Sequence, residues 1–215
     1  MDMKSRKVVT RFGRGYRGYF PSSKMQRVVE WESILERDAI LLFEFSRGVV
    51  SYQEQPELIE YEFEGEIRRY YPDFEVILRN GKIIHFEVKP ASKLKSPELI
   101  KKFNSIKFHY ERMGRDFRIL SSEEIQKYPR HSNLMYLTKF QFQNGADFSV
   151  KSKAMTAINA DLNPTIKSLS EIYGLVNVLL LISRGDIIFD FDVDLFAETN
   201  LVRLPREADD DSIFF

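Results

Sequence analysis

The sequence contains no cysteine and no excess of charge of either sign. Without cysteine the protein can form neither a disulfide scaffold nor a zinc site built from thiolates, and a reducing compartment is the default expectation. Its 32 basic residues balance its 32 acidic residues. Net basicity therefore does not indicate nucleic-acid binding, and any surface for nucleic acid has to come from local clusters of lysine and arginine.

Long apolar runs are also missing. The apolar run at residues 175–182 is far too short to cross a bilayer, and the first residues, Met-Asp-Met-Lys-Ser-Arg-Lys, are not followed by the apolar region of a signal peptide. We therefore expect a cytoplasmic protein with no membrane contact. Its 215 residues are enough for one domain of moderate size or for two small ones.

The most informative stretch is a hairpin pattern at residues 70–90. Asn80-Gly81 favours a tight turn, and apolar residues alternate on both sides of it: Phe74, Val76 and Leu78 before the turn, and Ile84, Phe86 and Val88 after it. A two-residue loop would place Phe74 opposite Glu87. The apolar pattern instead predicts a three-residue loop or a bulge near the turn, with Phe74 opposite Val88.

Charged residues share the other face of this hairpin. In the predicted register Asp73 lies opposite Lys89, and Glu75 lies opposite Glu87. One acid, followed on the next strand by an acid and a lysine two residues apart, is the constellation of a metal-dependent nuclease if all three face one side. The alternative is an ordinary charged face in contact with solvent, and the hairpin alone does not decide between them.

A further acid, Glu36, lies in the first turn of a helix predicted at residues 34–45. Ser33 and Glu36 have the spacing of a capping box, in which the glutamate satisfies a backbone N–H at the start of the helix. From the local sequence alone, this structural role is the favoured interpretation of Glu36.

The predicted elements follow the order of an α/β domain. After the first helix we expect strands at residues 49–52, 58–63 and 67–71, followed by the two strands of the hairpin. A second helix at residues 97–113 and a last strand at residues 117–120 complete the order. This order predicts a mixed sheet flanked by helices, with an edge strand brought in by the second helix.

The chain changes character near residue 144, where we place a domain boundary. Beyond it, we expect three helices, at residues 150–159, 165–173 and 175–183, and then a strand at residues 186–193. Residues 201–204 could pair with that strand. Three helices and a short hairpin resemble a winged helix. A recognition helix for DNA needs exposed basic or amide residues, whereas the third helix is nearly all apolar, so we expect this domain to contact protein.

Two basic segments are candidates for DNA contact. In the N-terminal arm, Arg11, Arg14 and Arg17 are interleaved with aromatic residues, a combination that suits phosphate contacts and base stacking. A charged arm that packs its aromatic residues on the core is the alternative. Beside the charged hairpin face, Lys93, Lys95 and Lys101 form a basic patch.

Four motifs in order carry a resemblance to a known family: Ser-Ile-Leu-Glu-Arg-Asp at 33–38, Val-Ser-Tyr-Gln-Glu-Gln-Pro at 50–56, Arg-Tyr-Tyr-Pro-Asp-Phe at 69–74 and Glu-Val-Lys-Pro at 87–90. Together they resemble TnsA, the restriction-endonuclease-like subunit of heteromeric cut-and-paste transposases, in the PD-(D/E)xK superfamily. The resemblance covers roughly residues 14–121. The remainder is similar in layout to the C-terminal winged-helix domain of that family, and the short overall form resembles members from CRISPR-associated transposons.

The resemblance implies a division of the chain and a set of site residues. Together with the basic and acidic composition of the two ends, it predicts a basic arm (1–24), an endonuclease domain (25–143), a winged-helix-like partner-binding domain (144–206) and an acidic tail (207–215). It implies that the catalytic residues are Glu36, Asp73, Glu87 and Lys89, and that Mg²⁺, with Mn²⁺ as a substitute, is held by Glu36, Asp73, Glu87 and the carbonyl of Val88. The best-known member carries glutamine where this chain has Glu87. Gln55 matches a further motif, and its amide is a candidate for contact with DNA or water, although a hydrogen bond at the end of its strand is the favoured interpretation.

The function that the resemblance implies is hydrolysis of the non-transferred strand at the 5′ ends of a transposon, in the bacterial cytoplasm. The expected partners are double-stranded DNA at the transposon ends, a TnsB-type DDE transposase that cuts and joins the 3′ ends, and a TnsC-type ATPase that contacts the C-terminal domain. A stand-alone restriction or repair nuclease of the same fold is the alternative, and a non-catalytic DNA-bridging subunit is another.

Overall fold

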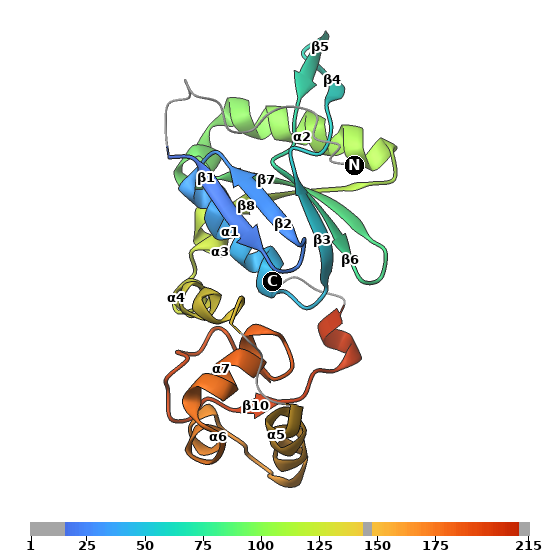
Figure 1. Ribbon diagram of the computed structural model, residues 1–215. Coiled ribbons are helices and arrows are strands. Elements are labelled where there is room, and N and C mark those ends of the chain that lie inside the picture. The colour runs from blue at the N-terminus through green and yellow to red at the C-terminus, as the bar shows by residue number, and fades with distance from the viewer. Residues whose placement is uncertain (1–15, 144–147, 211–215) are drawn as a thin grey trace. The chain divides into compact units, whose positions relative to one another are not determined.

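The computed structural model describes residues 16–143 and 148–210, which form two compact units (Figure 1). The first unit runs to Gln126 and includes Asp210, and the second comprises Lys127–Asp209. The border predicted near residue 144 thus lies inside the second unit. The reason is a helix that we did not predict, α4 (Arg130–Leu137), which contacts α7 (Leu175–Ser183) of that unit.

The first unit is built on a four-stranded mixed sheet with the strand order β3-β6-β7-β8. These strands are β3 (Val49–Glu54), β6 (Phe74–Leu78), β7 (Ile83–Lys89) and β8 (Asp116–Ser121). The first three are antiparallel, and β8 joins β7 in parallel after the helix α2 (Pro97–Arg112). A parallel strand requires a crossover connection, which α2 provides. The predicted α/β class with a mixed sheet and a late edge strand is confirmed, and the arrangement is consistent with a restriction-endonuclease-like fold.

The hairpin of β6 and β7 confirms the predicted faces and corrects the predicted partners. Phe74 pairs with Phe86 rather than with Val88, because the chain turns directly after Leu78, whose N–H donates to the carbonyl of Lys82. The connection is a three-residue loop, as predicted, with Gly81 at φ +82°. A displacement by two residues leaves every side chain on its predicted face.

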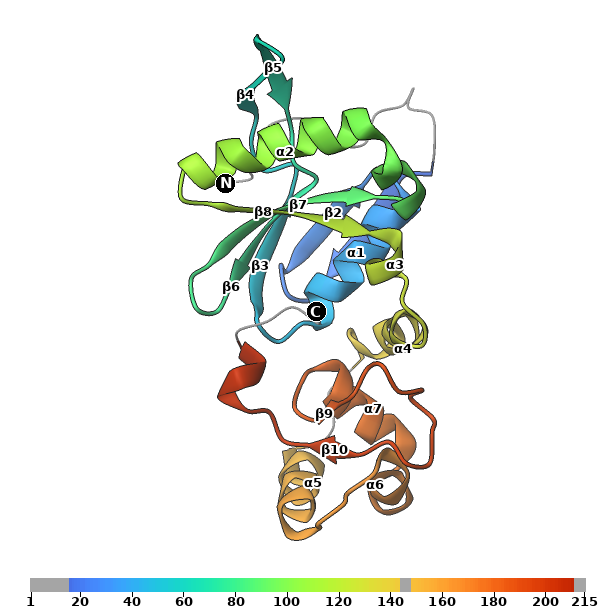
Figure 2. The same ribbon diagram turned by 180° about the vertical axis from the view of Figure 1, so that it is seen from behind.

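Two helices cover opposite faces of the sheet (Figures 1 and 2). Helix α1 (Ile34–Phe45) buries Phe43, whose ring centroid lies 5.3 Å from that of Phe74 and 5.5 Å from that of Phe86. Helix α2 covers the other face, where its buried Tyr110 stacks on His85 with ring centroids 4.5 Å apart. The hairpin face that carries His85 and Glu87 is therefore buried, which rules out the alternative of a charged face in contact with solvent.

Two ribbons flank this sheet. Strands β1 (Gly18–Ser22) and β2 (Arg27–Trp31) form one, and β4 (Ile59–Phe63) and β5 (Glu66–Tyr70) form the other, which extends beyond α2 in Figure 1. Within the predicted basic arm, residues 18–22 are thus an ordered strand. Phe20 is buried there and pairs with Val29, so this part of the arm belongs to the folded unit.

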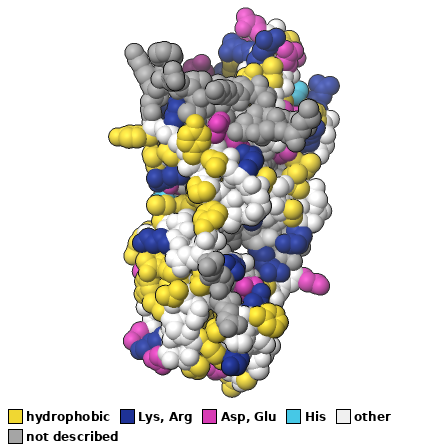
Figure 3. Space-filling model, viewed as in Figure 1, with side chains coloured by type: hydrophobic (Ala, Val, Ile, Leu, Met, Phe, Trp, Pro, Cys, Tyr) yellow, Lys and Arg dark blue, Asp and Glu magenta, His cyan; other side chains and the backbone are white. Residues whose placement is uncertain are grey.

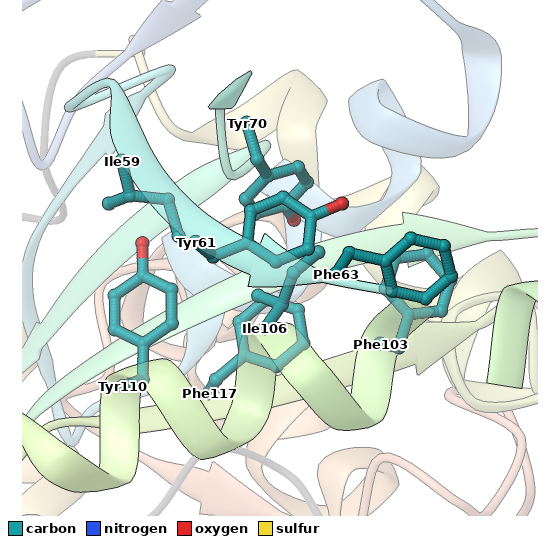
Figure 4. Close-up of a cluster of buried hydrophobic side chains, with 8 residues drawn as sticks. All are labelled: Ile59, Tyr61, Phe63, Tyr70, Phe103, Ile106, Tyr110 and Phe117. Carbon is teal, nitrogen blue, oxygen red and sulfur yellow. The ribbon is translucent and has the colours of Figure 1, made fainter. Parts of the chain in front are cut away.

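An aromatic cluster joins the β4–β5 ribbon to α2 and β8 (Figure 4). It consists of Ile59, Tyr61, Phe63, Tyr70, Phe103, Ile106, Tyr110 and Phe117. After β7 and β8, the short elements η1 (Ala91–Lys95) and α3 (Ser122–Ile125) complete the first unit. The cluster holds Tyr70, the last residue of β5, in a fixed place beside the sheet.

The second unit contains three helices followed by a small ribbon. These elements are α5 (Phe148–Ala160), α6 (Ile166–Tyr173), α7, β9 (Ile188–Phe189) and β10 (Val202–Arg203), with the short element η2 (Thr138–Phe140) and all but the last residue of η3 (Glu207–Asp210). The strand predicted at residues 186–193 is shorter, because the carbonyls of Phe191 and Val193 accept hydrogen bonds from the side chain of Asn133 instead of from a strand. The winged-helix identity of this unit stays a prediction.

Residues 211–215 of the predicted acidic tail, and Arg11 and Arg14 of the predicted arm, lie outside the described residues. Across the two described ranges, none of the helices has the length and apolarity needed to span a bilayer.

Candidate active site

The predicted acids and lysine meet where β7 ends beside the start of β6. Asp73 immediately precedes β6, and its Oδ2 accepts a hydrogen bond of 2.7 Å from the backbone N–H of Val88. Glu87 and Lys89 lie two residues apart on β7, and their side chains form an ion pair. Asp73 was predicted opposite Lys89. The observed register, in which Phe74 pairs with Phe86, places Asp73 opposite Glu87 instead, and its carboxylate still comes within 3.8 Å of the Lys89 Nζ.

The Lys89 ammonium lies among three oxygen atoms. It contacts Oε1 of Glu87, donates to the carbonyl oxygen of Val88 at 3.2 Å and lies 3.8 Å from Oδ2 of Asp73. These three groups are members of the predicted metal-binding set. In this structure they converge on the ammonium of Lys89, a positive charge of the protein itself, rather than on a metal ion.

Glu36 closes the first turn of α1. Its N–H donates to Ser33 Oγ at 3.1 Å, its Oε1 accepts from the Ser33 hydroxyl at 2.9 Å, and its Oε2 accepts from the N–H of Glu32 at 2.8 Å. The capping role predicted for Glu36 is present, although the backbone donor is Glu32 rather than Ser33. Each carboxylate oxygen keeps a second lone pair, so the cap does not exhaust what Glu36 can bind.

The charges of these residues influence one another. Burial, and then the negative charge of Glu87, raise the pKa of Asp73 well above its usual value, with a smaller contribution of the same sign from Glu36. Burial also raises the pKa of Glu36, while Lys89 lowers it. Burial opposes the charge of Lys89, but the carboxylates of Asp73 and Glu87 outweigh it and raise the pKa of this lysine. Lys89 is therefore a cation at neutral pH, which suits an electrostatic role better than that of a general base.

The donor set suits a hard divalent cation. Mg²⁺ prefers carboxylate and carbonyl oxygens, and such an ion would neutralise the negative charge that Asp73 and Glu87 carry when they are ionised. As the side chains stand, no group of three or more His, Asp or Glu within the described residues is arranged to hold a metal ion. The oxygens that already surround a positive charge, the Lys89 ammonium, are those of Asp73, Glu87 and Val88. The fit of a divalent cation to this site therefore depends on these three residues rather than on Glu36.

Two residues beside the site were not predicted. The hydroxyl of Tyr70 donates to Oε2 of Glu87. Glu32 joins the cap of Glu36 to Gln55, whose Nε2 lies 3.3 Å from Glu32 Oε2. Tyr70 is part of the motif that contains Asp73, but its contact with Glu87 depends on the packing of the β4–β5 ribbon, for which the sequence offers no local signal.

Gln55 and Arg17, both predicted to bind DNA, lie close to the site. Gln55 is buried in a left-handed conformation at φ +43°, and its N–H donates to the carbonyl of Asp73 at 3.0 Å. Such strain is uncommon outside glycine and clusters at functional sites. Arg17 lies 3.8 Å from Glu32. Both side chains thus lie beside the carboxylate of Glu32, and their predicted contact with DNA stays a prediction.

The lysines predicted to contact DNA are exposed. Lys93 and Lys95 lie on η1, directly after the strand that carries Lys89, and Lys101 lies on the first turns of α2. On the face that Figure 3 shows, basic side chains are interspersed with acidic and apolar ones. The lysines after β7 are thus a local basic cluster on a molecule of balanced charge.

Residues 46–122 match the family model described as TnsA-like endonuclease N terminal. None of the curated proteins compared with the chain matches it. The matched segment contains Asp73, Glu87 and Lys89 but begins after Glu36, and it covers less than half of the chain. The resemblance to TnsA-type endonucleases is thereby confirmed for this segment.

Proposed function

We propose that this chain, whose residues 46–122 form a TnsA-like endonuclease domain, is the metal-dependent endonuclease subunit of a cut-and-paste transposase. It would hydrolyse the non-transferred strand at the 5′ ends of the transposon. The observation that carries the proposal is the convergence of Asp73, Glu87 and Lys89 at one end of the β6–β7 hairpin, within electrostatic reach of Glu36.

Asp73, Glu87 and the carbonyl of Val88 would hold Mg²⁺, or Mn²⁺ in its place. When bound, such an ion would activate a water molecule as the nucleophile and would offset negative charge on the phosphate. The chain's own residues do the rest. The N–H of Val88 orients the carboxylate of Asp73, and the Lys89 ammonium stabilises the negative charge that develops on the phosphate. Glu36 adds a further carboxylate at the same site.

The second unit would bind the protein partners. Its helix α7 is the buried core of the unit from Val178 to Ile182, so this helix does not offer the polar surface that reads DNA bases. A groove of about 350 Å³ is lined by apolar side chains, among them Ile166, Leu195 and the exposed Phe196, and by the charged side chains of Lys167, Glu171 and Glu198. Exposed apolar surface of this kind suits a protein partner. The partner that binds this unit would be a TnsC-type ATPase. A TnsB-type DDE transposase would cut and join the 3′ ends, and the system would be a CRISPR-associated transposon of the bacterial cytoplasm.

The basic residues around the site would hold double-stranded DNA at the transposon ends, and three of them allow a test. Replacing Lys93, Lys95 and Lys101 together by glutamine should weaken binding to DNA of any sequence. If each lysine neutralises one phosphate, the slope of log Kd against log salt falls by roughly 2 to 3. Titration of a labelled duplex at several salt concentrations measures that slope. Lys167→Gln, an exposed lysine of the second unit paired with Glu198, is the control and should leave the slope unchanged.

Cleavage of an end-labelled transposon-end duplex tests the proposed function. The full chain is assayed with and without the transposase subunit, in Mg²⁺ and in chelator. We expect 5′-strand cleavage at the transposon end that requires Mg²⁺ and is stimulated by the partner. Equal cleavage of unrelated DNA without the partner would favour a stand-alone nuclease, and DNA binding without cleavage under every condition would favour a bridging subunit.

A further inference from the structure

The two oxygens of Glu87 have different partners. Oε1 contacts the Lys89 ammonium, which lies at the centre of the site, and Oε2 accepts from the hydroxyl of Tyr70 on the other side. Glu87 is only 4% exposed, so these protein groups, rather than bulk water, determine how its carboxylate is turned.

Tyr70 is held rigidly by the aromatic cluster. Its ring packs edge-on against Tyr61 and Phe117, each with a centroid distance of 6.2 Å, and the Lys102 ammonium lies 5.5 Å from its ring centroid. Figure 4 shows Tyr70 among these side chains. Its backbone pairs with Ile59 in the β4–β5 ribbon. The hydroxyl is therefore presented to Glu87 from a fixed position.

The same short segment supplies Asp73. Only Tyr71 and Pro72 separate Tyr70 from it, and the proline ring restricts the backbone between them. One connection, from the end of β5 to the start of β6, thus places a hydroxyl on one acid of the site and contributes the other acid itself.

We propose that Tyr70 is a positioning residue of the active site: its hydroxyl holds Oε2 of Glu87 so that Oε1 faces the position of the catalytic cation. This proposal rests on the proposed function. Without the hydroxyl, a buried carboxylate oxygen loses its donor, and the Glu87 side chain can rotate until both oxygens engage Lys89. Groups that orient metal ligands commonly change metal affinity or activity by about 10- to 100-fold.

Tyr70→Phe tests this role because it removes the hydroxyl and keeps the ring. We expect Mn²⁺ affinity, measured by calorimetry on the full chain, to fall by about tenfold or more, with cleavage reduced in parallel at subsaturating Mn²⁺. Tyr61→Phe is the matched control. Its ring belongs to the same cluster, and in the described part of the chain its hydroxyl makes no hydrogen bond to Glu87, so its Mn²⁺ affinity should equal that of the unsubstituted chain.

A double-mutant cycle separates positioning from a general structural effect. If Tyr70 acts through Glu87, adding Tyr70→Phe to Glu87→Ala should change Mn²⁺ affinity by less than about threefold. Unchanged affinity in Tyr70→Phe alone, equal losses in Tyr61→Phe, or a full additional loss on Glu87→Ala would each overturn the proposal. Thermal melting checks that every variant folds. If Tyr70→Phe itself fails to fold, the Tyr70 hydroxyl is structural and the proposal is wrong. Asp73→Asn tests the metal site itself, so the two failures remain distinct.

Discussion

Replacing Asp73 by asparagine should abolish Mg²⁺-dependent cleavage of the 5′ strand. Asparagine keeps the size of the side chain and an oxygen that can accept from the N–H of Val88, so the hairpin stays intact. It removes a negative charge and a carboxylate ligand from the cation position. We expect a loss of about 10³-fold or more, which corresponds to about 4 kcal/mol of transition-state stabilisation.

The measurement is single-turnover cleavage of an end-labelled transposon end in the presence of the transposase subunit. Asp116→Asn, on the neighbouring strand β8 and paired with Lys82, is the control and should cleave normally. Binding to the protein partners should survive in Asp73→Asn. If partner binding is lost to the same extent as cleavage, the substitution has disrupted the fold and the assignment of Asp73 as a metal ligand loses its support.

Replacing Lys89 by methionine should separate catalysis from metal binding. The ammonium group now lies among the oxygens of Asp73, Glu87 and Val88, where it competes with a bound cation. Its removal should tighten Mn²⁺ binding by at least about threefold, since even a screened unit charge at this distance is worth on the order of 1 kcal/mol. Cleavage should still fall by about 10²- to 10³-fold, because the charge that stabilises the transition state is gone.

Calorimetric titration with Mn²⁺ and single-turnover cleavage give the two readouts for Lys89→Met. The titration is best made on the alkaline side of neutrality, because burial and Glu87 raise the pKa of Asp73, and protons compete with the metal for its carboxylate. Lys82→Met, at the far end of the hairpin, is the control. A parallel loss of metal binding and cleavage in Lys89→Met would mean that the lysine supports the site rather than occupying the cation position.

The sequence was sufficient to predict which residues share a face of the hairpin, because side-chain alternation is a local property. The apolar alternation on the two strands also predicted a loop of three residues or a bulge near the turn, and the structure has the loop. The alternation of apolar residues could not determine which residues pair across the hairpin, because registers that differ by two residues keep the same faces. The closure of the turn after Leu78 decides between them.

The parts of the site that escaped prediction depend on distant packing. Tyr70 reaches Glu87 only because the β4–β5 ribbon is packed on α2, and Gln55 reaches Glu32 only because β3 ends beside the first turn of α1. The cap of Glu36 was visible in the sequence, but its partner, the N–H of Glu32, depends on how the chain enters the helix. Contacts between elements thus account for most of what could not be predicted.

The bond from the Glu32 amide to the Glu36 carboxylate turns the start of α1 into a spectroscopic probe. An amide proton held by a carboxylate exchanges slowly with solvent and has a characteristic chemical shift. Any event that draws Glu36 toward the phosphate would release that proton and accelerate its exchange. The nuclear magnetic resonance signal of the Glu32 amide proton therefore reports whether the Glu36 carboxylate caps the helix or has moved toward the substrate.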